Sequence, residues 1–315
     1  MRYGSWTFVA DVVAALDCGS NSTRLLIADA TGATLVREMN ITRLSQGVDA
    51  AGSLLPAAME RTFEVLRHYR DACDSAGVTR GLLVATSAVR DASNQLEFLD
   101  GARDIVGFEA KILRGDEEAA FSFDGATKEL GEAAVATMIV DVGGGSTELA
   151  VKVDGTLASY SMQLGCVRVS ERALGRGVVS AASDAAARSM IEAELDRAFA
   201  AAPALHDVVA KVRLVGLAGT VATLAQLDAG LAVYDRDVVH GRELARATVQ
   251  YWRDLLAKET PGERLLHPGM VVGREDVLVA GLYVLDAVME RFKVDVLLSS
   301  ENDILDGIAS SLLRL

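Results

Sequence analysis

The chain carries one short pattern twice, and this repeat constrains its fold more than any other feature. The stretch LDCGSNSTRLLIADATG opens at Leu16, and the stretch VDVGGGSTELAVKVDG opens at Val140. Each has an apolar run that ends in Asp, a corner rich in Gly and Ser, a second run with alternating character and a Gly turn. An offset of 124 residues aligns Asp17 with Asp141. Because this period is far too long for a solenoid, the repeat predicts a duplicated domain.

Apolar runs of strand length alternate with helical patterns along the rest of the chain. Residues 12–17, the run RLLIADA after the first corner and the run TLVREMNIT after the next turn predict an antiparallel meander of three strands. The second half opens in the same way. Residues 56–75 have helical periodicity with Pro56 in the first turn, and the run RELARATVQYWRDLLAKE from Arg242 also predicts a helix. The predicted fold class is therefore α/β.

Composition and charge narrow the classes of function. At 315 residues, with 50% hydrophobic and 24% charged residues, the chain has the makeup of a globular protein that divides into two domains. The formal net charge of −13 argues against a general nucleic-acid binder, which would carry a basic face. It does not exclude a small anionic substrate, because a local cluster of Arg and N–H groups can oppose the overall sign.

Cysteine usage and apolar runs indicate the compartment. Cys18, Cys73 and Cys166 are odd in number and far apart, so we expect no disulfide framework and a cytoplasmic protein. The N-terminal run WTFVADVVAAL resembles a weak signal peptide, but Asp11 interrupts it and cleavage there would destroy the first motif. The apolar run from Val277 is too short to span a bilayer, so we expect no membrane partner.

The two corners predict a phosphate site. Turns of Gly and Ser leave backbone N–H groups exposed, and such concave N–H arrays bind phosphate oxygens. The Asp that precedes each corner would repel phosphate unless a hard cation lay between them, and Mg²⁺ held by carboxylates, waters and phosphate oxygens is the usual arrangement. A single corner of this kind could equally be a tight hairpin turn, but two matched corners favour phosphate and metal binding. A third corner, GLAGT at residues 216–220, suggests another anion or nucleotide contact.

Seven motifs, in order along the chain, resemble those of the exopolyphosphatase and guanosine pentaphosphate phosphohydrolase family. They are DCGSNSTRLLIAD, ATSAVRDASN, ILRGDEEAAFSFDG, VDVGGGSTEL, LGCVRVSE, GLAGTVATLA and SENDILDGI. The family lies within the superfamily of actin, hexokinase and the heat-shock chaperones. The resemblance is to the short form and implies two ribonuclease-H-like domains, each a mixed five-stranded sheet flanked by helices, with the active site in the cleft between them. It predicts domain I at residues 1–124 with the C-terminal helix at 301–315, domain II at residues 125–300, and a homodimer.

The resemblance also implies roles for particular residues. Glu118 matches the family's general base, whereas Asp116 and Glu117 are interpreted as first-turn acids favoured by the helix dipole. Asp17, Asp141 and Glu148 match the acids near the metal. Arg90 and Asn94 match a segment that lines the phosphate channel, although Arg90 could instead be a solvated helix charge. The full predicted set of substrate-binding residues is Gly19, Ser20, Asn21, Ser22, Arg90, Asn94, Gly143, Gly144, Gly145, Ser146, Gly219 and Thr220.

The predicted function is removal of terminal orthophosphate from inorganic polyphosphate with Mg²⁺ as cofactor. Glu118 would assist the attack of water on the terminal phosphorus, and the two lobes would close on the substrate. Three alternatives stay open: guanosine pentaphosphate as the substrate, a regulatory protein that binds a phosphate ligand without turnover, and a sugar or acetate kinase of the same superfamily. The aligned positions Arg24 and Glu148 differ in charge, so we expect the second corner to carry more of the metal chemistry.

Overall fold

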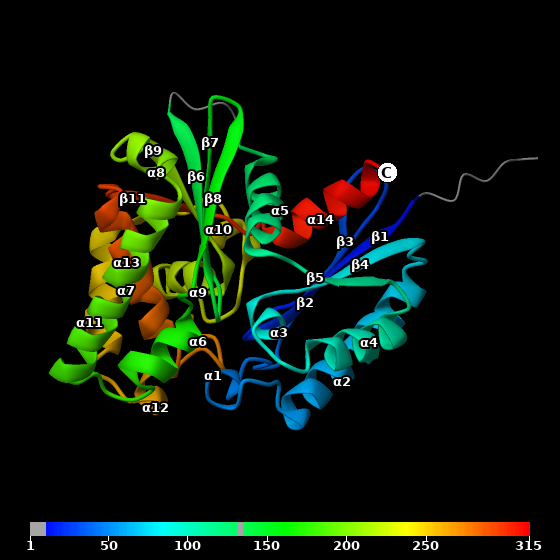
Figure 1. Ribbon diagram of the computed structural model, residues 1–315, viewed down its shortest axis with the longest axis horizontal. Helices are drawn as coiled ribbons and strands as arrows, with labels where there is room; N and C mark the ends of the chain where they lie inside the picture. Colours follow the sequence, from blue (N-terminus) through cyan, green and yellow to red (C-terminus); the bar gives the residue numbers. More distant parts are fainter. Residues whose placement is uncertain (1–10, 131–134) are drawn as a thin grey trace, which may run out of the picture.

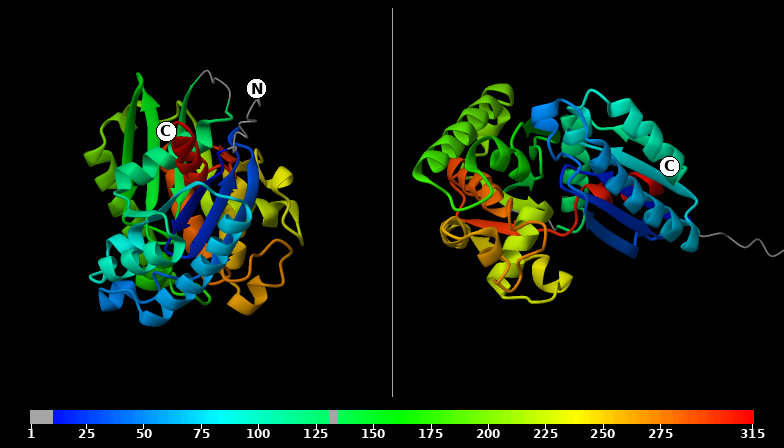
Figure 2. Two further views of the ribbon diagram at one scale, coloured as in Figure 1. Left: turned by 90° about the vertical axis from the view of Figure 1, so that its right-hand side faces the viewer. Right: turned by 90° about the horizontal axis from the view of Figure 1, so that it is seen from below.

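The chain folds into two lobes, each built on one twisted sheet. The computed structural model describes residues 11–130 and 135–315, so residues 6–10 of the run considered for a signal peptide lie outside the described residues. Lobe I lies at the right of Figure 1 and lobe II at the left, and the view from below separates them (Figure 2). None of the described helices is both long enough and apolar enough to cross a membrane.

Lobe I contains a five-stranded mixed sheet with the order β3-β2-β1-β4-β5. The first three strands form the predicted antiparallel meander, and β4 and β5 add in parallel. Helices α2 and α4 cover one face of the sheet, where Leu66 and Phe98 join the core. The elements are β1 (Val13–Cys18), β2 (Ser22–Ala28), β3 (Thr34–Ile41), α1 (Val48–Ala51), α2 (Pro56–Ser75), β4 (Arg80–Ala85), α3 (Ser87–Arg90), α4 (Gln95–Val106) and β5 (Glu109–Ile112).

Lobe II repeats this topology with one strand more. Its sheet has the order β10-β11-β9-β6-β7-β8, in which β6, β7 and β8 form the second antiparallel meander. The elements are β6 (Ala136–Val142), β7 (Thr147–Val153), β8 (Thr156–Met162), α6 (Cys166–Val169), a π-helical turn (Ser170–Leu174), α7 (Ala181–Ala201), α8 (Ala204–Asp207), β9 (Val212–Leu217), α9 (Ala218–Ala229), α10 (Arg236–Val239), β10 (Glu243–Ala245), α11 (Arg246–Leu256), α12 (Pro261–Arg264), α13 (Leu278–Arg291) and β11 (Val296–Ser299).

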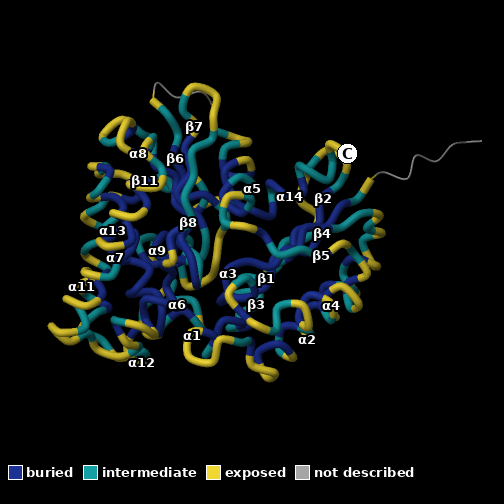
Figure 3. Tube along the Cα trace, viewed as in Figure 1, coloured by how far each residue is buried: buried dark blue, intermediate teal, exposed yellow. Residues whose placement is uncertain are grey.

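The prediction of two α/β lobes with mixed sheets is confirmed, but the second sheet has six strands where five were expected. The sixth strand, β10, comes from the run that was predicted to be helical from Arg242. Residues 243–245 pair in antiparallel register with β11, and the helix α11 begins only at Arg246. The central strands of both sheets are buried, and exposed positions lie mainly on the outer helices and loops (Figure 3).

Two helices exchange between the lobes. Helix α5 (Gly115–Thr127) follows β5 of lobe I but packs on the sheet of lobe II, where Phe123 contacts the core around Ile139. Helix α14 (Ile304–Leu313) follows β11 of lobe II but packs on the sheet of lobe I. The two helices lie side by side between the lobes (Figure 1). The predicted boundary between residues 124 and 125 falls within α5, and the division into domains stays a prediction.

Candidate active site

The two Gly-rich corners have the same local geometry. Gly19 N donates to Ser22 O at 3.0 Å, and Gly143 N donates to Ser146 O at 3.1 Å. Each corner closes the connection between the first two strands of its sheet, β1 to β2 and β6 to β7. The sequence repeat is thus a repeat of structure, with both corners at the carboxyl ends of central strands.

The corners lie against each other across the interface of the lobes. A Cβ at Gly144 would lie 2.8 Å from Cβ of Ser20, and a Cβ at Gly145 would lie 2.6 Å from Oγ of Ser87. Ser20 Oγ and Ser87 Oγ are 2.9 Å apart and share a hydrogen bond. Only glycine permits this approach, so the second corner needs its glycines for contact with lobe I as well as for its turn.

A cavity of about 540 Å³ opens beside the two corners and receives residues from both lobes. Its wall includes ten of the predicted site residues, namely Asp17, Gly19, Ser20, Asn21, Ser22, Glu118, Gly143, Gly144, Ser146 and Gly219. The other six, which are not among the residues that line the cavity, are Arg90, Asn94, Asp141, Gly145, Glu148 and Thr220. The fold therefore brings together predicted site residues as far apart in the sequence as Asp17 and Gly219.

Asp17 faces an arginine across the sheet. In the register of β1 and β2 it lies opposite Arg24. Nε and Nη2 of Arg24 both donate to Oδ2 of Asp17, at 3.0 and 2.6 Å. Oδ1 of Asp17 is buried and accepts no hydrogen bond from any residue in the described ranges. Burial raises the pKa of Asp17 in spite of this arginine.

The second corner places an acid where the first has an arginine. Asp141 on β6 lies opposite Glu148 on β7, and both are buried. Ser122 Oγ donates to Asp141 at 2.9 Å, and Ser161 Oγ donates to Glu148 at 2.7 Å. Burial, assisted by the charge of Asp141, raises the pKa of Glu148 to about 8, and burial raises the pKa of Asp141 to about 6.

Glu118 lies in the first turn of α5 with 8% of its surface exposed. Its Oε2 accepts from Nη1 of Arg90 at 3.1 Å, and the same nitrogen donates to Leu113 O at 2.8 Å. Burial and the nearby charge of Glu148 raise the pKa of Glu118 well above its usual range. A buried carboxylate of raised pKa at a cavity wall is suited to accept a proton.

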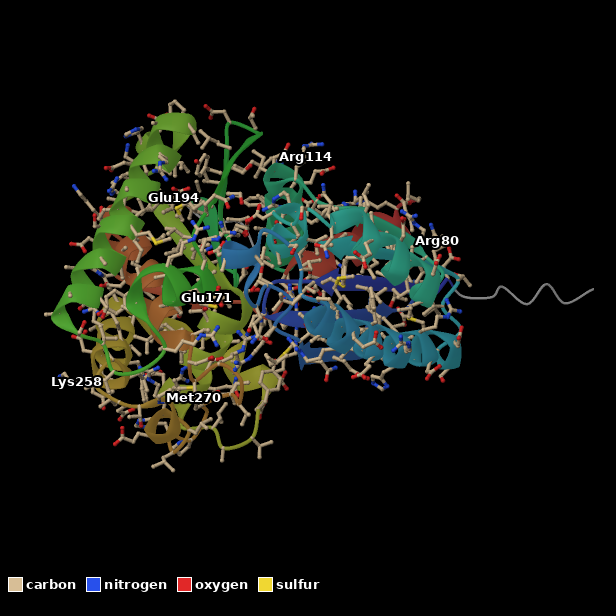
Figure 4. All side chains as sticks on the ribbon, turned by 60° about the horizontal axis from the view of Figure 1, so that its bottom comes forward. Arg80, Arg114, Glu171, Glu194, Lys258 and Met270 are labelled. Atoms are coloured by element: carbon tan, nitrogen blue, oxygen red, sulfur yellow. The ribbon has the colours of Figure 1, made fainter. Side chains whose placement is uncertain are left out.

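The neighbouring acids of α5 point elsewhere. Asp116 is exposed and pairs with Arg114 at 3.0 Å, and Arg114 lies at the outer end of α5 (Figure 4). Glu117 accepts from the backbone N–H of Arg114 at 2.9 Å and so caps the helix. Their interpretation as first-turn acids is consistent with these positions.

Three predicted substrate-binding residues are held by hydrogen bonds to other residues of the chain. The amide of Asn94 donates to Leu54 O at 3.1 Å and accepts from Leu54 N at 2.8 Å. Thr220 Oγ1 donates to Val142 O at 3.4 Å. Arg90 reaches the cavity only through its bond to Glu118, so it is not the solvated helix charge considered above. Their roles in substrate binding stay predictions.

Sequence reasoning did not assign several charged groups of the cavity wall to the site, although it compared Arg24 with Glu148. Arg24 is held by Asp17 and by Asp303, which lies just before α14, and Arg37 of β3 bonds Asp306. Although burial works against it, the carboxylates of Asp303 and Asp17 raise the pKa of Arg24. The hairpin register was the available signal for Arg24, because a tight turn between two antiparallel strands places Arg24 opposite Asp17.

Arg274 is a further cavity residue that the sequence did not single out. It is buried, and burial lowers its pKa. A Cβ at Gly219 would lie 1.8 Å from Cζ of Arg274, so the glycine of the third corner leaves the space in which this guanidinium lies. Ala218, beside it, has a positive φ of 66°, a backbone conformation that non-glycine residues rarely adopt away from functional turns.

The side chains do not form a complete metal cage. Within residues 11–130 and 135–315, no group of three or more His, Cys, Asp and Glu side chains is arranged to hold an ion. Mg²⁺, however, usually takes only one or two carboxylates together with waters and substrate phosphates. The bare Oδ1 of Asp17 and the paired acids Asp141 and Glu148 fit an ion that binds with its substrate.

Comparison with known proteins identifies the family. The family model described as the Ppx/GppA phosphatase family matches residues 26–314. The chain belongs to the Ppx/GppA phosphatase family. Among its relatives, Exopolyphosphatase 2 of Mycobacterium tuberculosis is 39% identical over 319 residues, which cover 95% of this chain and 98% of the relative. A bifunctional 3-dehydroquinate synthase/phosphatase of Fusobacterium nucleatum is 27% identical, over 93% of this chain and 45% of that protein.

Solved structures of Ppx/GppA proteins have the same fold. An exopolyphosphatase-like protein is 31% identical with a TM-score of 0.89, over 96% of this chain and 99% of the other. The Ppx/GppA family member of Aquifex aeolicus is 27% identical with a TM-score of 0.79, over 97% of this chain and 98% of the other. The family resemblance drawn from the seven motifs is thus confirmed.

Proposed function

We propose that this chain is an exopolyphosphatase that hydrolyses terminal orthophosphate from inorganic polyphosphate with Mg²⁺. The observation that carries the proposal is the placement of Glu118, a buried carboxylate in the same cavity wall as both Gly-rich corners. The relative from M. tuberculosis, named an exopolyphosphatase, supports the choice of substrate.

In the proposed reaction the corners bind and Glu118 accepts the proton. The backbone N–H groups of the Gly- and Ser-rich turns would hold the oxygens of the terminal phosphate. A water oxygen forms the new bond to the terminal phosphorus while its proton passes to Glu118. The bond from phosphorus to the bridging oxygen breaks, and the shortened chain leaves with the electron pair of that bond.

The charges of the site favour a cation as cofactor. Arg24 and Arg37 are paired with carboxylates, Glu118 is paired with Arg90, and Asp141 and Glu148 accept hydrogen bonds from Ser122 and Ser161. A phosphate oxygen that approached Asp17, Asp141 and Glu148 would be repelled by whichever of these carboxylates is ionised, although Arg274 lies elsewhere in the cavity wall. Asp17, Asp141 and Glu148 would hold Mg²⁺, which when bound neutralises phosphate charge and stabilises the transition state.

The test is phosphate release from polyphosphate by the purified protein. We expect release that needs Mg²⁺ and stops when EDTA removes the ion. Guanosine pentaphosphate at matched concentration serves as the competing substrate, and ATP with sugar or acetate acceptors tests the kinase alternative. If the protein binds polyphosphate in the presence of Mg²⁺ but releases no phosphate from it, the result would support the alternative of a regulatory binding protein.

Guanosine pentaphosphate is a second candidate substrate. The cavity extends past the corners to Met39, Tyr234 and Val271, whose apolar surfaces could contact a base or a ribose. Faster hydrolysis of the guanosine compound than of polyphosphate would make it the preferred substrate.

The compartment and the assembly are proposed from the cysteines and from the family resemblance. All three cysteines are free and buried, which supports a cytoplasmic protein. The homodimer rests on the family resemblance and on the exposed sheet edges expected of an α/β fold, and light scattering coupled to size-exclusion chromatography tests it. A mass of one chain of 33.3 kDa would contradict it.

A further inference from the structure

Asp303 makes two kinds of contact from one carboxylate. Its Oδ1 accepts from Leu305 N at 2.9 Å and so caps α14, while its own N–H donates to Asp306 at 2.8 Å. Its Oδ2 accepts from Nη1 of Arg24. The residue is 6% exposed and lies in the cavity wall. Capping of α14 accounts for the contact of Oδ1 but not for the bond between Oδ2 and Arg24.

The bond to Asp303 accounts for an unusual arrangement of Arg24 on Asp17. Arginine and carboxylate commonly pair two nitrogens with two oxygens. Here Nε and Nη2 of Arg24 both donate to Oδ2 of Asp17, and Oδ1 of Asp17 is buried without a partner among the described residues. A guanidinium that is held at Nη1 by a second acid is not free to turn onto Oδ1.

Asp303 is itself fixed on its other side. Arg37 of β3 lies 3.9 Å from Oδ1 of Asp303 and bonds Asp306 one turn along the helix. A Cβ at Gly125 of α5 would lie 1.9 Å from the backbone oxygen of Asp303, so the backbone of Asp303 packs closely against α5. The carboxylate thus has little freedom to follow Arg24 if that arginine moves.

We propose that Asp303 is a positioning residue: it holds Arg24 on one oxygen of Asp17 and thereby keeps the other oxygen free for the cation. The inference rests on the proposed function, in which Asp17 helps to hold Mg²⁺. Asp303 acts through Arg24 and need not touch the ion or the substrate.

Asp303→Asn tests the proposal, because Asn is an equally good N-cap but lacks the charge that holds Arg24. Arg24 can then satisfy both oxygens of Asp17. We expect the Mg²⁺ concentration for half-maximal phosphate release to rise about tenfold, as when the partners of metal ligands are removed. KM for polyphosphate at saturating Mg²⁺ should stay the same or fall. Asp303→Ser, another good cap without a carboxylate, serves if the first variant does not fold.

A second measurement does not depend on turnover. Titration of MgCl₂ in the presence of inorganic phosphate should raise the melting temperature of the wild type, and Asp303→Asn should need about tenfold more Mg²⁺ for the same shift. Asp124→Asn is the control, because it removes an exposed carboxylate that pairs with Arg314 at the other end of α14. It should respond to Mg²⁺ as the wild type does.

Three results separate the possibilities. A Mg²⁺ response of Asp303→Asn that equals that of the wild type overturns the proposal and leaves Asp303 as a helix cap. Asp303→Asn can also be introduced into the Arg24→Met variant. If it then lowers the affinity for Mg²⁺ as much as it does in the wild type, the proposal is overturned, because Asp303 would act on the ion directly and not through Arg24. A wild type without Mg²⁺-dependent phosphate release overturns the proposed function instead, and the melting measurement still tests Asp303.

Discussion

At the scale of the residue, the two corners differ most in how their acids are compensated. Asp17 faces Arg24 across the strands, whereas Asp141 faces Glu148. Two buried carboxylates that face each other cannot both ionise cheaply, so protons or a cation must compensate them. Because burial raises the pKa of Glu148 to about 8, this side chain keeps its proton at neutral pH when no cation is present.

This difference predicts how stability depends on pH. Between about 4.5 and 8 the unfolded chain ionises Glu148 while the folded protein still keeps the proton, so the free energy of unfolding falls as pH rises through this window. Glu148→Gln should remove much of that fall and stabilise the metal-free protein at pH 8 by about 1–3 kcal/mol. Urea unfolding of the wild type and of Glu148→Gln at pH 5 and pH 8 measures this difference in stability.

The exposed Glu97 of α4 supplies the control for this pair of measurements. Glu97→Gln should leave the pH dependence as in the wild type. If Glu148→Gln changes stability by the same amount at both pH values, the raised pKa of Glu148 is wrong.

Local sequence spacing predicted the corner residues, since each corner lies within one hairpin. The positions of Arg274 and Asp303 could not be predicted in this way. Each joins the cavity through tertiary packing, Arg274 over Gly219 and Asp303 against Arg24. For Asn94 the family motif placed a residue in the site, whereas the structure bonds its amide to the backbone of Leu54.

At the scale of the element, the contact between α5 and α14 joins the lobes. A Cβ at Gly125 would lie 1.9 Å from Asp303 O, and a Cβ at Gly307 would lie 2.0 Å from Phe121 O. Each helix therefore presents a glycine to the backbone of the other. Because each helix also packs on one sheet, relative movement of the lobes must be accommodated at this contact.

Gly125→Ala should destabilise the protein in spite of the better helix propensity of alanine. The added methyl group would meet backbone atoms, which cannot rotate away, and overpacking of this kind costs about 1–3 kcal/mol. Urea unfolding measures the loss. Gly262→Ala in α12 is the control, because nothing lies within 4 Å of the position of its Cβ, and it should be neutral or stabilising. Equal stability of the two variants would contradict close packing at Gly125.

Most elements could be predicted from periodicity, but their partners could not. The run from Arg242 has a helical pattern, yet residues 243–245 pair with β11 because the edge of the sheet is open to them. Likewise nothing in the sequence of α5 indicated that it packs on lobe II. Its buried side chains fit the second sheet, and that fit exists only in the folded molecule.

At the scale of the whole molecule, ion pairs join the lobes beside the corners. Each pair takes one side chain from lobe I and one from lobe II, at distances of 2.5 to 3.2 Å. The pairs are Arg43 with Asp276, Asp91 with Arg168, and Asp49 with Arg172. Because these groups are partly exposed, salt screens their attraction.

Salt should therefore open the cleft. Between about 0.05 and 0.5 M NaCl the screening length falls from over 10 Å to a few ångströms, so we expect the radius of gyration from solution X-ray scattering to increase. Asp49→Asn should show part of this increase at low salt. Asp100→Asn, which breaks a pair within α4 alone, should not. A radius of gyration that is independent of salt would show that these pairs do not hold the lobes together.

The central claim is that Glu118 accepts the proton of the attacking water in a cleft built from two copies of one corner. The most direct test is the rate of Mg²⁺-dependent phosphate release from polyphosphate by Glu118→Gln, with Asp116→Asn in the same helical turn as the control. We expect kcat to fall by about 10²–10⁴-fold for Glu118→Gln while polyphosphate still binds, and to stay unchanged for Asp116→Asn. Equal rates for the wild type and Glu118→Gln would contradict the mechanism.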